Sequence, residues 1–325
     1  MLQLWMSGCG CRAAPLSGAI GYSLRLRELG VMSYLRQAVT PDAWSFHRGQ
    51  FATSEGQTEK TSVVFQNGES GKSALRSFFV DIVMFCAHPL LRLPLALYKQ
   101  EVNSGPFPAD EPELVIAGSD PDHLLFIGDV AVAGYGVMEH GMTVASHTAR
   151  LISHDRRRGC RWATIGATDL TIAKVERMDD LGAADVDVAI IMLGIPDVLL
   201  ATSSTRWAAN LGSVIDHIQD RAAADCRIIL AAIPPMGDFQ DMPPWVRKLL
   251  TLQIHRLNQV TLAATLHRPN TVFVPFPDLR VGKMFVGDLF SWKALHQMWA
   301  HVIAAATMTA LDEAGKTGPH LTHGD

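Results

Sequence analysis

The sequence predicts an α/β fold, a three-layer α/β/α sandwich around a five-stranded parallel sheet. Two observations support this prediction. From residue 124 onward, short apolar runs alternate with segments of helix length. These runs also lack the strict polar alternation of a strand that is buried on only one face. Strands that are buried on both faces and followed by helices are typical of a parallel sheet covered on two sides.

Each expected element is a segment of this pattern. The apolar runs expected to form strands are residues 124–128, 162–166, 186–193, 227–233 and 271–276. The segments expected to form helices are residues 143–154, 170–178, 205–221, 245–266 and 292–311. In such sheets, ligands bind beyond the carboxyl ends of the strands. Functional residues are therefore expected in the loops that follow the strands.

The composition indicates a folded chain. Of its 325 residues, 48% are hydrophobic and 18% are charged, which is too few charges for a typical disordered protein. The net charge of −4 gives no electrostatic footprint for nucleic acid, so no nucleic-acid partner is expected. The five cysteines are too few and too scattered for a disulfide scaffold.

The composition also changes along the chain. Residues 1–77 mix small, polar and charged residues with short apolar runs, so a poorly structured N-terminal region is expected there. Residues 78–122 are expected to form an apolar helix and linker, residues 123–312 the α/β domain, and residues 313–325 a flexible tail. The N-terminus lacks a basic segment, so no cleaved leader is expected.

One segment, residues 78–98, has the length of a membrane span. It contains Asp81, Arg92 and two prolines. A central charge costs roughly 2.5–3.5 kcal/mol on insertion, and each proline removes a helix hydrogen bond. We therefore expect packing on the protein's own core, with contact between residues 78–98 and a membrane surface as the first alternative and a damaged membrane span as the second. The compartment stays unknown, with a cytoplasmic protein favoured over a membrane-associated one.

Four blocks of sequence resemble those of the SGNH (GDSL-type) esterases and acylhydrolases. Residues 124–136, LLFIGDVAVAGYG, resemble the first block, a strand followed by Gly-Asp-Ser. Gly166 in TIGATDLT resembles the second, and LGIPD at 193–197 resembles the third, Gly-x-Asn-Asp. Asp288, followed by LFSWKALHQMWAHVIA, resembles the last, Asp-x-x-His. The resemblance covers about residues 123–312 and implies the SGNH-hydrolase fold, a flavodoxin-like sandwich.

The chain departs from this family at the positions that carry the chemistry. Val130 stands at the nucleophilic serine, Pro196 at the oxyanion asparagine and Ser291 at the catalytic histidine, while Gly166 and Asp288 remain. Valine has no lone pair to attack a carbonyl, and a serine hydroxyl is no base near neutral pH. Proline offers no donor for an oxyanion. No catalytic residue is therefore expected.

A binding role remains compatible with these replacements. The backbone N–H groups of Val130 and Gly166 can hold a carboxylate or carbonyl, which predicts a small acyl or carboxylate ligand at this site. Asp129 and Asp197 adjoin the altered positions and are candidate ligand-binding residues, although such acids chiefly hold loops by capping backbone N–H groups. The competing interpretation is a pocket filled by Val130 and Pro196.

Two functions follow from this interpretation. The favoured one is a non-catalytic pseudo-esterase that binds a ligand or a protein partner. The alternative is an ester hydrolase or acyltransferase that acts on acyl lipids or acyl sugars through rearranged residues, such as His296 with Asp288. His296 lies a full turn into the last expected helix, so it is expected to face away from the strand ends.

No cofactor and no metal site are expected. His140, His147 and His154 recur every seven residues on a predicted helical stretch. Seven residues correspond to about 10.5 Å of helix rise, which is too far for their side chains to share one ion.

Overall fold

The computed structural model describes residues 94–223, 225–236, 242–266, 268, 270–277, 285–286 and 289–317. All of them fall in a compact unit that includes residues 84–325. The predictions for residues 1–77, and for most of the segment 78–98, lie outside the described residues. So does Asp288.

The central sheet has six strands in the order β1-β3-β2-β4-β5-β6. Five of them are parallel and confirm the predicted strands: β2 (Asp122–Gly128), β3 (Cys160–Gly166), β4 (Val188–Met192), β5 (Arg227–Ala231) and β6 (Thr271–Val274). The sixth corrects the prediction of a five-stranded, wholly parallel sheet. It is β1 (Val115–Ile116), which pairs antiparallel with β3 at the edge. Its two residues lie in a short apolar run, LVIA at residues 114–117, which the prediction did not assign to a strand.

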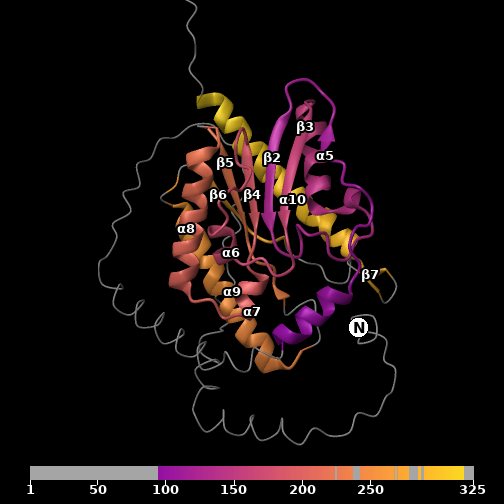
Figure 1. The fold of residues 1–325 in the computed structure, drawn as a ribbon, viewed down its shortest axis with the longest axis vertical. Coiled ribbons are helices and arrows are strands. Elements are labelled where there is room, and N and C mark those ends of the chain that lie inside the picture. The colour runs from indigo at the N-terminus through magenta and orange to yellow at the C-terminus, as the bar shows by residue number, and fades with distance from the viewer. Residues whose placement is uncertain are drawn as a thin grey trace, which may run out of the picture. The chain divides into compact units, whose positions relative to one another are not determined.

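Helices cover both faces of the sheet, which confirms the three-layer sandwich (Figure 1). On one face lie α5 (Val144–Arg156) and α10 (Trp292–Thr317), which pack on each other. On the other face lie α6 (Ile172–Glu176), α8 (Ser204–Arg221) and α9 (Pro244–Thr265). The last helix continues to Thr317, past its predicted end at residue 311.

Three shorter elements complete the fold. Helix α7 (Ile195–Leu199) follows β4, and a 3-10 turn, η2 (His140–Met142), precedes α5. Strands β7 (Phe285–Val286) and β8 (Leu289–Phe290) form a separate antiparallel pair. Residues 94–104 are helical and precede the sheet.

The core explains why the central strands are almost wholly apolar. All five residues of β4 are buried, and so are the last five residues of β2. Leu124 and Phe126 of β2 belong to the core cluster with α5 and α10, so Leu125 and Ile127 face the opposite layer. Because both faces of these strands are covered, neither face tolerates regular polar residues.

Polar side chains fix the beginnings of the helices. The hydroxyls of Thr143, Thr171 and Ser203 accept hydrogen bonds from backbone N–H groups in the first turns of α5, α6 and α8. Such a cap contributes about 1 kcal/mol to stability. At the other end of α5, Arg156 Nε lies 2.9 Å from Asp122 Oδ2 at the start of β2. This pair ties the helix end to the sheet.

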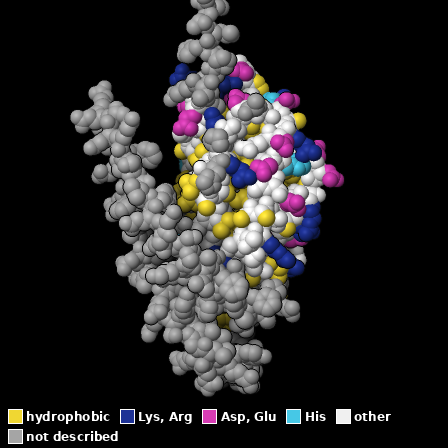
Figure 2. Space-filling view, turned by 90° about the vertical axis from the view of Figure 1, so that its left-hand side faces the viewer, with side chains coloured by type: hydrophobic (Ala, Val, Ile, Leu, Met, Phe, Trp, Pro, Cys, Tyr) yellow, Lys and Arg dark blue, Asp and Glu magenta, His cyan; other side chains and the backbone are white. Residues whose placement is uncertain are grey.

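The described surface is mixed in charge. On the face that Figure 2 shows, acidic and basic side chains of the described residues are interspersed. Among the described residues, no helix combines the length and the apolar character that crossing a membrane requires.

Candidate functional site

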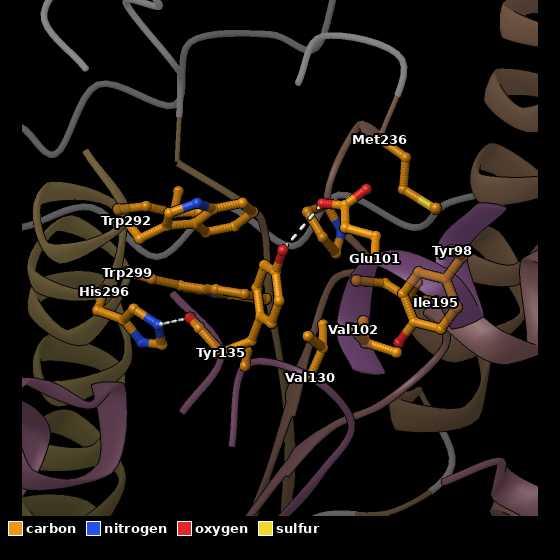
Figure 3. A pocket seen from close by; sticks show the side chains of 13 residues that line it. Tyr98, Glu101, Val102, Val130, Tyr135, Ile195, Met236, Trp292, His296 and Trp299 are labelled. Atoms are coloured by element: carbon orange, nitrogen blue, oxygen red, sulfur yellow. Dashed lines mark hydrogen bonds between the residues drawn. The ribbon is translucent and has the colours of Figure 1, made fainter. Parts of the chain in front are cut away.

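A pocket of about 740 Å³, including its open mouth, lies beyond the carboxyl ends of the strands (Figure 3). This is where ligands bind in open parallel sheets. Its walls come from the segments after β2, β4 and β5, from the start of α10 and from helical residues 94–104. The lining residues are Tyr98, Glu101, Val102, Val130, Ala131, Tyr135, Ile195, Pro234, Met236, Trp292, Leu295, His296 and Trp299.

Aromatic rings form much of the wall. The rings of Tyr135 and Trp292 meet edge to face, with centroids 5.0 Å apart. Gly136 makes this approach possible, because it has a φ of +86° and a Cβ there would lie 2.2 Å from Cγ of Trp292. A side chain at this position would push the indole away. The turn after β2 is therefore shaped to bring Tyr135 and Trp292 together.

Asp129 holds the floor of the site rather than facing the pocket. It is 2% exposed, and its Oδ2 accepts hydrogen bonds of 2.9 Å from the N–H groups of both Gly194 and Ile195. These bonds join the turn after β2 to the start of α7. Burial raises the pKa of Asp129 to about 7, although the N–H groups of Ile195 and Gly194 oppose the shift.

Asp197 is also a buried acid whose side chain joins two segments, here α7 and the start of α6. Its Oδ2 accepts a hydrogen bond from the N–H of Ile172 at the start of α6, and its Oδ1 accepts one from the hydroxyl of Thr202. Burial raises the pKa of Asp197 to about 6. In the structure, then, both candidate acids hold loops through buried hydrogen bonds, and neither is among the residues that line the pocket.

Val130 and Gly166 lie in different surroundings. Val130, the position that the resemblance assigns to a nucleophile, is half-buried and lines the pocket. Gly166 ends β3 and is not among the lining residues. A Cβ on Gly166 would lie 2.9 Å from the backbone nitrogen of Ala133, so glycine permits a close backbone approach there.

The two other positions at which the resemblance predicts a replacement have structural roles. Pro196 is buried in the first turn of α7, where a proline costs no helix hydrogen bond. The hydroxyl of Ser291 accepts a hydrogen bond of 3.2 Å from the N–H of Ala294 and so caps α10. Neither residue is among those that line the pocket.

His296 lines the pocket, but both ring nitrogens are engaged. Its Nδ1 accepts a hydrogen bond of 3.1 Å from the N–H of Val144, and its Nε2 lies 3.0 Å from the carbonyl oxygen of Tyr135. Since a carbonyl can only accept, Nε2 carries the proton. The ring is 3% exposed, and burial lowers the pKa of His296. A neutral imidazole with both nitrogens bonded is a poor candidate for a general base.

Helical residues 94–104 add polar groups that the sequence does not single out. Tyr98, Glu101 and Val102 line the pocket at i, i+3 and i+4, a spacing that could have shown that they share one helix face. The hydroxyl of Tyr135 donates a hydrogen bond of 3.0 Å to Glu101 Oε1, and the hydroxyl of Tyr98 donates one of 2.5 Å to the carbonyl of Thr168.

Among the described residues, no group of three or more His, Cys, Asp or Glu side chains could hold a metal ion. The arrangement is an apolar, aromatic-walled pocket with one carboxylate at its rim and buried acids behind its floor. It can enclose a small molecule.

The fold and the pocket define an α/β protein that has its candidate ligand site at the carboxyl edge of a mostly parallel sheet. The family model for the GDSL-like Lipase/Acylhydrolase family matches residues 126–302, more than half of the chain. The chain belongs to this family, as the sequence blocks predict.

Several solved structures are similar to this chain. A family two carbohydrate esterase from Clostridium thermocellum is 18% identical with a TM-score of 0.45, over 61% of this chain and 67% of that chain. A member of the lipolytic protein G-D-S-L family from Veillonella parvula is 15% identical with a TM-score of 0.42, over 57% of this chain and 98% of that chain. No curated protein matches the sequence.

Proposed function

We propose that this chain is a non-catalytic member of its family that binds a small molecule in the pocket beyond the strand ends. One observation carries the proposal. Among the 13 described residues that line the pocket there is no Ser, Thr, Cys, Lys or Asp, and one of them is Val130, which the sequence resemblance aligns with the family's nucleophile. Covalent acyl transfer needs a nucleophile next to a base, and the described lining supplies neither in a usable form.

The state of His296 supports the same conclusion. A rearranged enzyme would need this imidazole as its base, because it is the only imidazole among the described lining residues. Its Nδ1 is held by the start of α5 and its Nε2 by the carbonyl of Tyr135. Using it as a base would break a buried hydrogen bond, which costs about 1–3 kcal/mol.

The pocket itself supports binding. It lies beyond the strand ends and is lined mainly by apolar and aromatic side chains, as small-molecule sites usually are. Val130 lines the pocket, while Pro196 is packed in α7. The two residues therefore leave an open site, which favours the ligand-binding hypothesis over a pocket filled with core side chains.

The test compares ester turnover by the full chain with that of a triple variant, Val130→Ser, Pro196→Asn and Ser291→His. Short and medium acyl esters are the substrates. The proposal predicts no turnover above background for the natural chain, whereas a gain by the folded variant would show that the scaffold can support the chemistry. Turnover by the natural chain that survives purification and disappears in His296→Ala would overturn the proposal.

A further inference from the structure

We propose that the pocket binds an uncharged aromatic molecule in preference to a carboxylate and to a saturated ring of the same size. This inference rests on the proposed binding function, since it names the ligand class for the same pocket. Two observations on the lining carry it. Most of the hydrogen-bond donors of the lining are already used within the protein, and aromatic rings form much of the wall (Figure 3).

The first argument is that three side-chain donors of the lining are engaged. The hydroxyl of Tyr98 donates to the carbonyl of Thr168, and the hydroxyl of Tyr135 donates to the carboxylate of Glu101. The Nε2–H of His296 donates to the carbonyl of Tyr135. Each tyrosine oxygen can still accept a hydrogen bond from a ligand hydroxyl, but it has no hydrogen left to give to a ligand anion.

The two tryptophans change this little. Nε1 of Trp299 is buried away from solvent, so a ligand in the pocket does not reach it. The N–H of Trp292 is a single uncharged donor, and the described lining contains no Lys or Arg. A carboxylate that leaves water loses several hydrogen bonds at once, and this lining does not replace them.

The second argument concerns the backbone donors. The buried carboxylate of Asp129 accepts hydrogen bonds from the N–H groups of Ile195 and Ala131, two of the lining residues. Of the two N–H groups that the sequence assigns to a carboxylate ligand, only that of Val130 belongs to a lining residue, because Gly166 is not among them. The paired donors that would hold a carboxylate are therefore not both in the pocket, and an uncharged ligand does not need them.

The third argument is the geometry of the rings. Tyr135 and Trp292 meet edge to face, and so do Trp299 and Phe276, with centroids 4.9 Å apart in the second pair. These contacts fix the orientation of three rings that line the pocket. An aromatic ligand can add a further edge-to-face or offset contact, which a saturated ring cannot make. One such contact favours the aromatic ligand by about 2–10-fold beyond the area that it buries.

The rings are held on two helices, one inside and one outside the matched family domain. Trp292 and Trp299 lie seven residues apart on α10, so they share one face of that helix. Tyr98 comes from helical residues 94–104, whereas the family match begins at residue 126. The aromatic wall is therefore partly built by a segment of this chain that the family match does not include.

The test uses three probes with closely similar skeletons: 2-phenylethanol, 2-cyclohexylethanol and phenylacetate. Their dissociation constants for the full chain are measured by ligand-observed NMR at pH 8, where phenylacetate is ionised. We expect 2-phenylethanol to bind at least about 3-fold more tightly than 2-cyclohexylethanol, although burial of apolar area alone would favour the more apolar cyclohexyl ring. We expect it to bind at least about 10-fold more tightly than phenylacetate.

Two variants separate the arguments. Trp292→Leu removes one ring of the wall and should abolish the preference for phenyl over cyclohexyl, with Tyr98→Leu as the second variant if the first does not fold. Its matched control is Trp245→Leu on α9, outside the described lining, which should leave all three constants unchanged. Val130→Lys adds a charged donor to the pocket and should bring phenylacetate within about 3-fold of 2-phenylethanol. Thermal unfolding checks that each variant folds.

The outcomes are distinguishable from those of the proposed function. If 2-cyclohexylethanol binds as tightly as 2-phenylethanol, or if phenylacetate does, the inference is overturned while ligand binding stands. The same holds if the folded ring variants keep the phenyl preference, or if folded Val130→Lys leaves phenylacetate as weak as before. If none of the three probes binds, the inference is also overturned, and ester turnover then decides the proposed function separately.

Discussion

The buried carboxylate of Asp129 gives a quantitative prediction. Asp129→Ala removes the acceptor of two hydrogen bonds, each 2.9 Å long, from the N–H groups of Gly194 and Ile195. Both N–H groups lie in the buried junction between β4 and α7, and Gly194 has a φ of +138° that this turn requires. Nothing in an alanine side chain can replace the lost acceptor.

The size of the effect depends on pH, because burial raises the pKa of Asp129 to about 7. Above that pH, removing the side chain would also remove a poorly solvated charge and so partly offset the loss. At pH 5.5 the carboxyl is neutral, and the variant loses only its hydrogen bonds and packing. Two unsatisfied buried N–H groups cost about 1–3 kcal/mol each, so we expect a loss of about 2–6 kcal/mol in the free energy of unfolding.

The assay is urea unfolding of the full chain at pH 5.5, followed by far-UV circular dichroism. The matched control is Asp155→Ala on α5, whose side chain is 51% exposed and pairs with its exposed neighbour His154. The control should change the free energy of unfolding by less than about 0.5 kcal/mol. If Asp129→Ala is no more destabilising than this control, Asp129 does not hold the junction as described.

Three further predictions follow from the same structure. Burial raises the pKa of Asp129 to about 7 and that of Asp197 to about 6. Their contribution to the free energy of unfolding is therefore present below about pH 4 and is lost as the pH rises through those values. Urea unfolding at a series of pH values checks this, and a free energy of unfolding that does not change between pH 4 and pH 8 would contradict it. Gly136→Ala should lower the melting temperature more than Gly182→Ala does. Both glycines have a positive φ, but only at position 136 would the new Cβ clash with the indole of Trp292. Ser291→Ala removes the cap of α10 and should cost about 0.5–2 kcal/mol; an unchanged melting temperature would refute that role.

The sheet could be predicted because its strands are buried on both faces. β4 is a continuous apolar run, and β5 is one after its first residue, Arg227. The structure extends β2 and β3 by two residues at their starts, where Asp122 and Cys160 carry no strand signal of their own. β1 was not predicted, because its apolar run, LVIA at residues 114–117, is short and is not followed by a segment of helix length as the other strands are. α7 was not predicted either, because the Gly-Ile-Pro sequence at its start is also typical of a turn.

Only part of the site could be predicted from the sequence. The strand-end positions of Val130 and Ile195 follow from the sheet topology. Sequence periodicity does not show that the N–H of Val144 and the carbonyl of Tyr135 hold the two nitrogens of His296, because these contacts join segments far apart in the chain. The same holds for Glu101, which reaches Tyr135 across 34 residues. Long-range contacts of this kind decide the chemistry of the site.

Reaction with a fluorophosphonate probe is the measurement that tests the proposed absence of catalysis most directly. Such probes form a covalent adduct with an activated serine, and intact mass spectrometry of the full chain detects one adduct per molecule. The triple variant Val130→Ser, Pro196→Asn and Ser291→His serves as the comparison. We expect no stoichiometric adduct on the natural chain. A single adduct at a defined residue of the natural chain would contradict the proposal that this family member lacks a working nucleophile.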